Sequence, residues 1–470
     1  MGVVRVALTS GLVAGLSGLT AFSVTALPYF DINHATPLLL CTAGAWVLFA
    51  LAILALRRVS MKPAIAIILA GSALIGGAAM LGPPNTSTDS ARYAWDGIVQ
   101  NAGISPYTYV PVDDALARLR PEWLFPAAVD NGDGTYRCIP PRTHLTASVP
   151  SNDMFCTAIN RSVAPTIYPA ASELFFAGVR FLTGPGPEYW PLQLTGLLMS
   201  LAITAILIVA LRRRGLDPRL AALWGWSPLV ATEAVTNSHV DVLAALLAVV
   251  ATLLVSRGFR FRGGIALGAA IAVKLIPVIA APALLRRQPG KVIGAAIITF
   301  TVLYVPYLIA SGIGVLGYLP GYLSEEGYNN GRRFALLTFV IPKSAALVVA
   351  VVLLVVTVGL VWWKTNPEQP WLGQLVMIGT TLLIVSPRYP WYALLLVPFI
   401  ALSGRWEWFA VPLAMTARLL VSSHTPTFDQ LTMSVAAAFI IGMAIYRSGP
   451  EGRARLRGAV DRLRRHSRRA

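Results

Sequence analysis

Charged side chains are scarce in this sequence, which argues against a soluble domain. Only 13% of the 470 residues are Asp, Glu, Lys or Arg, whereas soluble domains average about 25%. Hydrophobic residues make up 56% of the chain and the mean hydropathy is +0.65. Apolar runs recur throughout, and about 20 apolar residues in a helix cross a membrane. The alternating segments of about ten residues that are typical of a membrane barrel are missing. These features predict an all-α polytopic membrane protein.

Several motifs that accompany nucleotide or metal chemistry are also missing. The sequence contains no Walker A motif, no G-x-G-x-x-G that opens a helix after a strand, and no CxxC or Cys/His pattern. No cofactor or metal is therefore expected. The net charge of +17 lies mostly in short basic clusters between apolar runs and in the C-terminal tail. This distribution is typical of the positive-inside rule and does not indicate nucleic-acid binding.

Cysteine is rare, with three residues in the chain. Cys41 lies inside an apolar run, where a cysteine behaves as a small packed residue. Cys138 and Cys156 share the long polar loop. If that loop faces an oxidising compartment, the two are candidates for a disulfide; two free thiols are the alternative.

The basic clusters set the predicted topology. Arg5 precedes the first apolar run, and Arg57, Arg58 and Lys62 follow the second. Placing these clusters in the cytoplasm leaves both termini inside and the first long loop outside a plasma membrane. The predicted divisions are transmembrane helices 1–3 in 1–82, an extracytoplasmic loop with interfacial helices in 83–188, a transmembrane bundle in 189–446, and a basic cytoplasmic tail in 447–470.

Two apolar segments do not fit simple spans. The stretch IYPAASELFFAGVRFL, at 167–182, contains Pro169, Glu173 and Arg180, so we predict a helix lying in the outer interface. Residues 264–285 have basic flanks at both ends, which predicts a broken re-entrant segment bent near Pro277. The expected total is about twelve transmembrane helices together with these two partial elements.

Ionisable groups gather at the predicted outer ends of the helices, where charges near hydrocarbon are costly and usually functional. Because nucleotide sugars and ATP are missing outside the membrane, a transferase there needs a lipid-carried donor such as a polyprenyl-phosphate sugar. Its phosphodiester requires cations, and its acceptor hydroxyl requires a carboxylate base. The candidates are Asp89 and Asp96 as bases, Arg332, Arg333, Arg388 and Lys274 as phosphate ligands, and Arg92, Tyr93, Trp95, His239, Asp241, Glu326 and Tyr389 as substrate-binding residues.

Each candidate also has a structural interpretation. Asp96 and Arg92 are spaced to form a solvated ion pair of little energetic value, and Tyr93 and Trp95 fit an interfacial aromatic belt. Asn237 or Ser238 in N-S-H-V-D fits a helix cap, and Lys274 fits a side chain that snorkels to the inner surface.

Six motifs resemble one family. The stretch D-S-A-R-Y-A-W-D-G-I-V-Q-N-A-G-I-S-P-Y, at 89–107, is similar to the first outer loop of actinobacterial polyprenol-phosphate-sugar-dependent glycosyltransferases of the GT-C superfamily, in particular the family 87-like mannosyltransferases. The other motifs, in order along the chain, are C-T-A-I-N-R-S-V-A-P-T-I-Y-P (156–169), N-S-H-V-D (237–241), K-L-I-P (274–277), L-P-G-Y-L-S-E-E-G-Y (319–328) and R-Y-P-W-Y (388–392).

The resemblance implies a GT-C-like helical bundle whose early aspartate, Asp89 here, is the catalytic base. It implies transfer with inversion of a single sugar, mannose being the first expectation, from a polyprenyl phosphate to a lipid or glycan acceptor on the outer face. Membrane lipid, the lipid-linked donor and the acceptor are the expected partners. Two rivals remain: a flippase or transporter of lipid-linked sugars, and an outer-face glycan ligase or polymerase.

Overall fold

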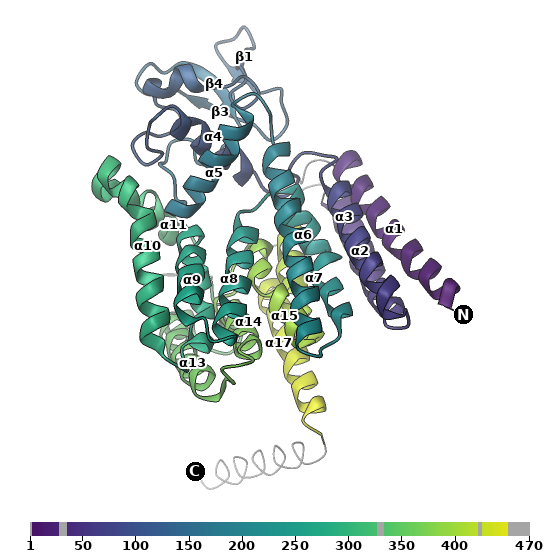
Figure 1. Cartoon of the computed structure of the whole chain (residues 1–470). Coiled ribbons are helices and arrows are strands. Elements are labelled where there is room, and N and C mark those ends of the chain that lie inside the picture. The colour runs from purple at the N-terminus through teal and green to yellow at the C-terminus, as the bar shows by residue number, and fades with distance from the viewer. Residues whose placement is uncertain (1, 28–34, 327–332, 422–424, 450–470) are drawn as a thin grey trace.

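The computed structural model describes residues 2–27, 35–326, 333–421 and 425–449, and helices dominate this part of the chain. A bundle of long helices carries a cap formed by the loop between α3 and α6 (Figure 1). The long helices are α1 (Gly2–Ala26), α2 (Thr36–Leu56), α3 (Met61–Ala79), α6 (Trp190–Arg213), α8 (Asp241–Ser256), α10 (Pro289–Ser311), α13 (Lys343–Lys364) and α17 (Pro426–Arg447).

Shorter elements complete the bundle. They are η3 (Pro218–Ala221), α7 (Ala222–Gly225), η4 (Val230–Thr236), α9 (Arg260–Val273), η5 (Ile276–Ala280), η6 (Pro282–Leu284), η7 (Gly312–Leu316), α11 (Leu319–Glu325), α12 (Ala335–Thr338), α14 (Trp371–Val385), η8 (Pro390–Leu395), α15 (Val397–Ser403), η9 (Trp406–Phe409) and α16 (Ala410–Leu420). The largest apolar cluster joins α1–α3 with α6, α8 and α14–α17.

The all-α polytopic fold is confirmed, but the expected count of about twelve spans is too high. Among the described residues, seven helices are long and apolar enough to span a membrane, or eight if η4 and α8, which meet at a bend of 112°, form one span. Pro390, Pro398 and Pro412 begin or interrupt the short helices of the last third. Proline lacks the N–H that a helix needs, so these segments stay below the length that crosses a bilayer.

The cap contains both helices and small strands. Its helices are α4 (Asp89–Asn101), η2 (Asp114–Leu119) and α5 (Ala170–Thr183). Two antiparallel hairpins, β1 (Val129–Asp130) with β2 (Tyr136–Arg137) and β3 (His144–Ala147) with β4 (Met154–Thr157), lie between η2 and α5. These strands were not predicted in the sequence analysis. Cys138 and Cys156 form a disulfide that ties the first hairpin to β4.

Helix α5 occupies the segment expected in the outer interface. Its Phe176 and Val179 are buried against the cap, whereas Phe181 and Leu182 keep 80% and 83% of their surface exposed. This two-sided pattern is what a helix at a membrane surface requires. The predicted break near Pro277 is present as well: α9 ends at Val273, Lys274 is extended, and the 3₁₀ turn η5 follows.

Gly97 sets the distance between α4 and α5. A Cβ atom at Gly97 would overlap the carbonyl of Phe176, whereas one at Gly178 on α5 would meet nothing within 4 Å. The backbones of α4 and α5 therefore approach closely at Gly97, whereas Gly178 faces open space.

We expect Gly97→Ala to push α4 and α5 apart and to lower the melting temperature of the purified protein by several degrees, because the overlap is with backbone. Gly178→Ala is the matched control and should be neutral or slightly stabilising, since alanine favours a helix over glycine. Equal melting temperatures for the two variants in thermal unfolding would contradict this packing.

Candidate functional site

Asp89 begins α4 at the junction of the cap and the bundle. Its backbone N–H donates to Ser87 Oγ at 3.2 Å. Its side chain keeps 18% of its surface exposed, and its carboxylate accepts a hydrogen bond from Asn160 Nδ2 at 3.4 Å. On the bundle side, Oδ2 lies 3.6 Å from His239 Nδ1. Asp89 is thus a fixed carboxylate with an accessible edge.

His239 is fully buried directly beneath Asp89. It lies in the bend between η4 and α8, and its backbone N–H donates to the Glu233 carbonyl at 2.9 Å. Its Nε2 lies 3.3 Å from Glu233 Oε2, its Nδ1 lies 3.5 Å from the Tyr93 hydroxyl, and its ring stacks on Trp391 at 4.0 Å. The imidazole is therefore enclosed by Glu233, Tyr93 and Trp391, with its Nδ1 toward Asp89.

Asn237 joins the broken helix to the chain that leads into α4. Its Oδ1 accepts the backbone N–H groups of Asn85 and Thr86 at 3.0 and 3.2 Å. Its Nδ2 donates to Thr86 Oγ1 at 2.6 Å and to Glu233 Oε2 at 3.0 Å. Because one side chain satisfies four partners, residues 85–86, and with them Asp89, are fixed relative to His239.

Lys274 approaches this network from the end of α9. Its Nζ contacts Asp241 Oδ2 at 2.5 Å and lies 4.9 Å from the centre of the Tyr392 ring. Because α9 stops at Val273, Lys274 is directed to this cluster and does not snorkel to the inner surface. The broken helices at 237–241 and 274–277 thus bring N-S-H-V-D and K-L-I-P together.

Arg161 is a cation of this site that the sequence analysis did not single out. Its guanidinium binds Glu325 at 2.7 Å and lies 5.5 Å from the centre of the Tyr322 ring. Asp89 and Tyr389 both raise its pKa electrostatically, and the Glu325 hydrogen bond does so more strongly, against the opposing effect of burial. Its position in the quoted stretch C-T-A-I-N-R-S-V-A-P was the only available signal, since a loop arginine otherwise looks like ordinary surface charge.

The remaining predicted phosphate ligands are arranged differently from one another. Arg333 is buried and paired with Glu326, and its pKa is lowered by burial in spite of the nearby tyrosines 392, 322 and 389. Arg388 is exposed, with its guanidinium 5.9 Å from the Tyr389 ring centre. Arg332 lies outside the described residues. Arg333 thus lies among Tyr322, Tyr389 and Tyr392, whereas Arg388 lies beside Tyr389 at the surface.

Several aromatic rings pack around His239. Tyr389 stacks on Trp391 at 4.3 Å, and Trp391 stacks in turn on His239. The Tyr322 and Tyr392 hydroxyls hydrogen-bond at 2.7 Å. The aromatic rings thus enclose His239 and lie beside the cations Arg161 and Lys274.

Asp96 has a structural role in this fold, which corrects its prediction as an alternative base. Its side chain is 1% exposed and pairs with Arg92 at 2.7 Å, inside the cap. Burial raises the pKa of Asp96 against the opposing charge of Arg92, and burial together with the charge of Asp96 raises the pKa of Glu173 well above its usual range. Burial of the pair thus favours the protonated form of Glu173, and both carboxyl groups lie inside the cap.

Arg92, Tyr93 and Trp95 are also placed in the cap interior. Arg92 donates to the Ala164 carbonyl at 2.9 Å, and Trp95 packs edge-on against Phe125 at 4.7 Å. Tyr93 stacks on Phe176 at 4.4 Å and reaches the site only through its hydroxyl near His239. The predicted substrate contacts of Arg92 and Trp95 are thus replaced by packing, because α4 is buried on nearly all sides.

We expect Glu173→Gln to keep the protein folded, since glutamine is neutral like a protonated glutamate and keeps one acceptor oxygen for Thr166 or Gln100. A carboxyl with a raised pKa in the folded state stabilises the fold at low pH, and that stability is lost as the pH rises through the folded pKa. The melting temperature of wild type should therefore fall as the pH rises toward the folded pKa of Glu173, and that of Glu173→Gln should fall less.

The matched variant Asp96→Asn leaves Arg92 buried without a counter-charge. This should cost about 3 kcal/mol or more, seen as a lower melting temperature at all pH values. A flat and equal pH profile for wild type and Glu173→Gln would rule out the raised pKa of Glu173.

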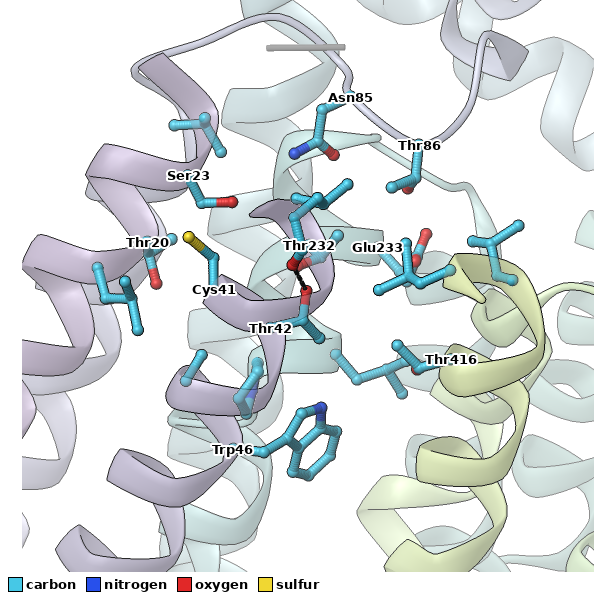
Figure 2. A pocket seen from close by; sticks show the side chains of 18 residues that line it. Thr20, Ser23, Cys41, Thr42, Trp46, Asn85, Thr86, Thr232, Glu233 and Thr416 are labelled. Carbon is cyan, nitrogen blue, oxygen red and sulfur yellow. Dashed lines mark hydrogen bonds between the residues drawn. The ribbon is translucent and has the colours of Figure 1, made fainter. Parts of the chain in front are cut away.

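Among the described residues, no group of three or more His, Cys, Asp or Glu side chains is arranged to hold a metal ion. A groove lies between α1, α2, η4 and α16, with Asn85, Thr86 and Glu233 at one end (Figure 2). This end borders the same Asn237 and His239 network that fixes Asp89.

Comparison with known families gives one match. Residues 166–387, just under half of the chain, match the family model described as glycosyltransferase family 87. No curated protein and no solved structure matches the chain. The matched segment contains His239, Lys274 and Arg333, whereas Asp89 and Arg161 precede it.

Proposed function

Because residues 166–387 resemble glycosyltransferase family 87 in a multi-pass membrane chain, we propose that this membrane glycosyltransferase moves one sugar, mannose first among candidates, from a polyprenyl-phosphate donor to a hydroxyl of a lipid or glycan acceptor. The observation that carries the proposal is the position of Asp89. It is an accessible carboxylate between a buried histidine and a group of cations and aromatic rings.

The proposed chemistry is a direct displacement. Asp89 accepts the proton of the acceptor hydroxyl, and the oxygen forms a bond to the anomeric carbon. The bond from that carbon to the phosphate oxygen breaks, and polyprenyl phosphate leaves with the electron pair and one more negative charge. Arg161 and Lys274 are close enough to Asp89 and His239 to stabilise that charge, which is where preorganised cations contribute most. Attack opposite the leaving group inverts the anomeric carbon.

Charge on the helix ends supports an outer-face site. Arg57 and Arg58 follow α2, and Arg212 and Arg213 end α6. Asp89 follows the other end of α3, so these arginines lie at the end of the bundle away from the cap (Figure 1). By the positive-inside rule the arginine end faces the cytoplasm, and the cap with Asp89 faces outward, where donors are carried on lipids.

We expect Asp89→Asn to lower transfer by about 10²–10⁴-fold, the usual contribution of a general base, while the melting temperature stays within a few degrees of wild type. The assay uses protein in lipid bilayers, labelled polyprenyl-phosphate mannose and a membrane lipid extract as acceptor. Asp133→Asn changes an exposed aspartate of the β1–β2 turn and is the control. Transfer by Asp89→Asn at the wild-type rate would remove Asp89 from the mechanism.

Lys274→Gln should raise the KM for the donor about tenfold or more, because a charge-assisted contact to phosphate is lost. Lys274→Arg should restore part of the affinity. Arg388→Gln is the matched control on an exposed cation outside the Lys274 cluster and should change the donor KM less than twofold. A larger effect for Arg388→Gln than for Lys274→Gln would move the phosphate to the exposed arginine.

A further inference from the structure

A second binding site lies beside the proposed catalytic centre. The groove lies between α1, α2, η4 and α16 and is partly open to the surroundings. Aliphatic side chains form much of its wall: Leu19, Val24, Leu38, Leu229, Leu419 and Leu420. Because α1 and α2 are membrane-spanning candidates, the space is within reach of bilayer lipid.

Thr20 on α1 and Thr42 on α2 line the groove with their hydroxyls already bonded within their own helices. Thr20 donates its hydroxyl to the Leu16 carbonyl at 2.9 Å, and Thr42 donates its own to the Leu38 carbonyl at 2.7 Å. With these hydroxyls bound to their own helices, hydrocarbon is the ligand that fits between α1 and α2.

One end of the groove is polar and offers hydrogen-bond acceptors. Figure 2 shows Asn85 and the Glu233 carboxylate near each other at this end, away from Trp46. Asn85 is 2% exposed, and its Oδ1 has no hydrogen-bond partner among the described residues. A buried acceptor without a donor is costly, so a ligand that brings a hydroxyl to Asn85 would satisfy it.

The charge of the groove separates it from the phosphate side of the site. No Lys, Arg or His occurs among its described lining residues, and Glu233 is the one acidic residue there. Arg161 binds Glu325 and Lys274 binds Asp241, and neither cation lines the groove. A phosphate would therefore find no cation among the described lining residues, whereas a sugar or glycerol hydroxyl would find acceptors in Asn85 and Glu233.

We propose that this groove binds the hydrocarbon chain of the acceptor lipid, with an uncharged, hydroxyl-bearing head at Asn85 and Glu233, next to the network that holds Asp89. The assignment rests on the transferase function proposed above. It separates the substrates: the acceptor enters from the side of α1, α2 and α16, and the donor phosphate binds on the side of Lys274 and Arg161.

Photocrosslinking tests the site without requiring turnover. The protein in bilayers is irradiated with either of two probes: diacylglycerol with a diazirine in one acyl chain, or polyprenyl phosphate with a diazirine in its chain. We expect diacylglycerol to label peptides of α2 and α16, and polyprenyl phosphate to label them at least about fivefold less. Preferential labelling of these helices by polyprenyl phosphate would overturn the proposal.

Cys41 supplies an internal block. It lines the groove and is the free cysteine that remains when Cys138 and Cys156 are paired. Alkylation with a membrane-permeant maleimide should reduce diacylglycerol labelling at least about tenfold in wild type and leave it unchanged in Cys41→Ala treated with the same reagent. Labelling of fully alkylated wild type at the untreated level would show that the groove is not the site.

The polar end is tested by Asn85→Leu, which removes the unpartnered acceptor, and Asn85→Asp, which keeps one. Labelling by diacylglycerol should fall several-fold in the first variant and recover in the second; equal labelling in both would refute the head-group assignment. In the transfer assay, alkylated wild type should lose transfer to the lipid extract relative to untreated wild type, whereas the reagent should make no difference between treated and untreated Cys41→Ala. Full transfer by alkylated wild type would overturn the acceptor role, and labelling without transfer from any lipid-linked sugar would refute the proposed function.

Discussion

The hydrogen bonds of Asn237 are the constraint on which the arrangement of the site depends. A helix that breaks inside a membrane leaves backbone groups that lipid cannot satisfy, so a break persists only where protein supplies partners. Here the side chain of Asn237 accepts from the backbone of residues 85–86 and donates to Thr86 and Glu233. The break between η4 and α8 is thereby joined to the segment that leads into α4, and His239 is brought under Asp89.

The cap solves a related problem with its own buried charges. Asp96, Arg92 and Glu173 lie inside it with almost no exposure. Burying a lone ion is costly, but an ion pair with further hydrogen bonds is tolerated. Arg92 satisfies Asp96 and the Ala164 carbonyl, while Thr166 and Gln100 donate to Glu173. The result is a rigid α4 whose first residue, Asp89, is the carboxylate left accessible.

Sequence patterns predicted the class of fold, the long first loop, a separate helix at 167–182 and the break near Pro277, because hydropathy, basic flanks and proline act locally. The break at 237–241 was not predicted. Resemblance suggested Asp89 as the base, which stays a prediction, and could not separate it from Asp96. Both are aspartates of one short helix, and only the packing of α4 against α5 and β4 buries one and exposes the other. Arg161 was missed for the same reason, since its importance depends on Glu325, 164 residues away. The span count failed because short proline-broken helices have the composition of spans without their length.

Under the proposed function, the distribution of charge around Asp89 limits how two lipid substrates could meet there. Cations lie on the side of α9 and α11, and hydrogen-bond acceptors lie on the side of α1, α2 and α16. The proposed displacement with inversion needs the attacking oxygen and the leaving phosphate on opposite faces of the sugar. Substrates that reached Asp89 from these two different sides would meet that requirement without rotation of the sugar. Two lipids from the same leaflet would then be sorted at Asp89 by the charge of their heads and not by their chains.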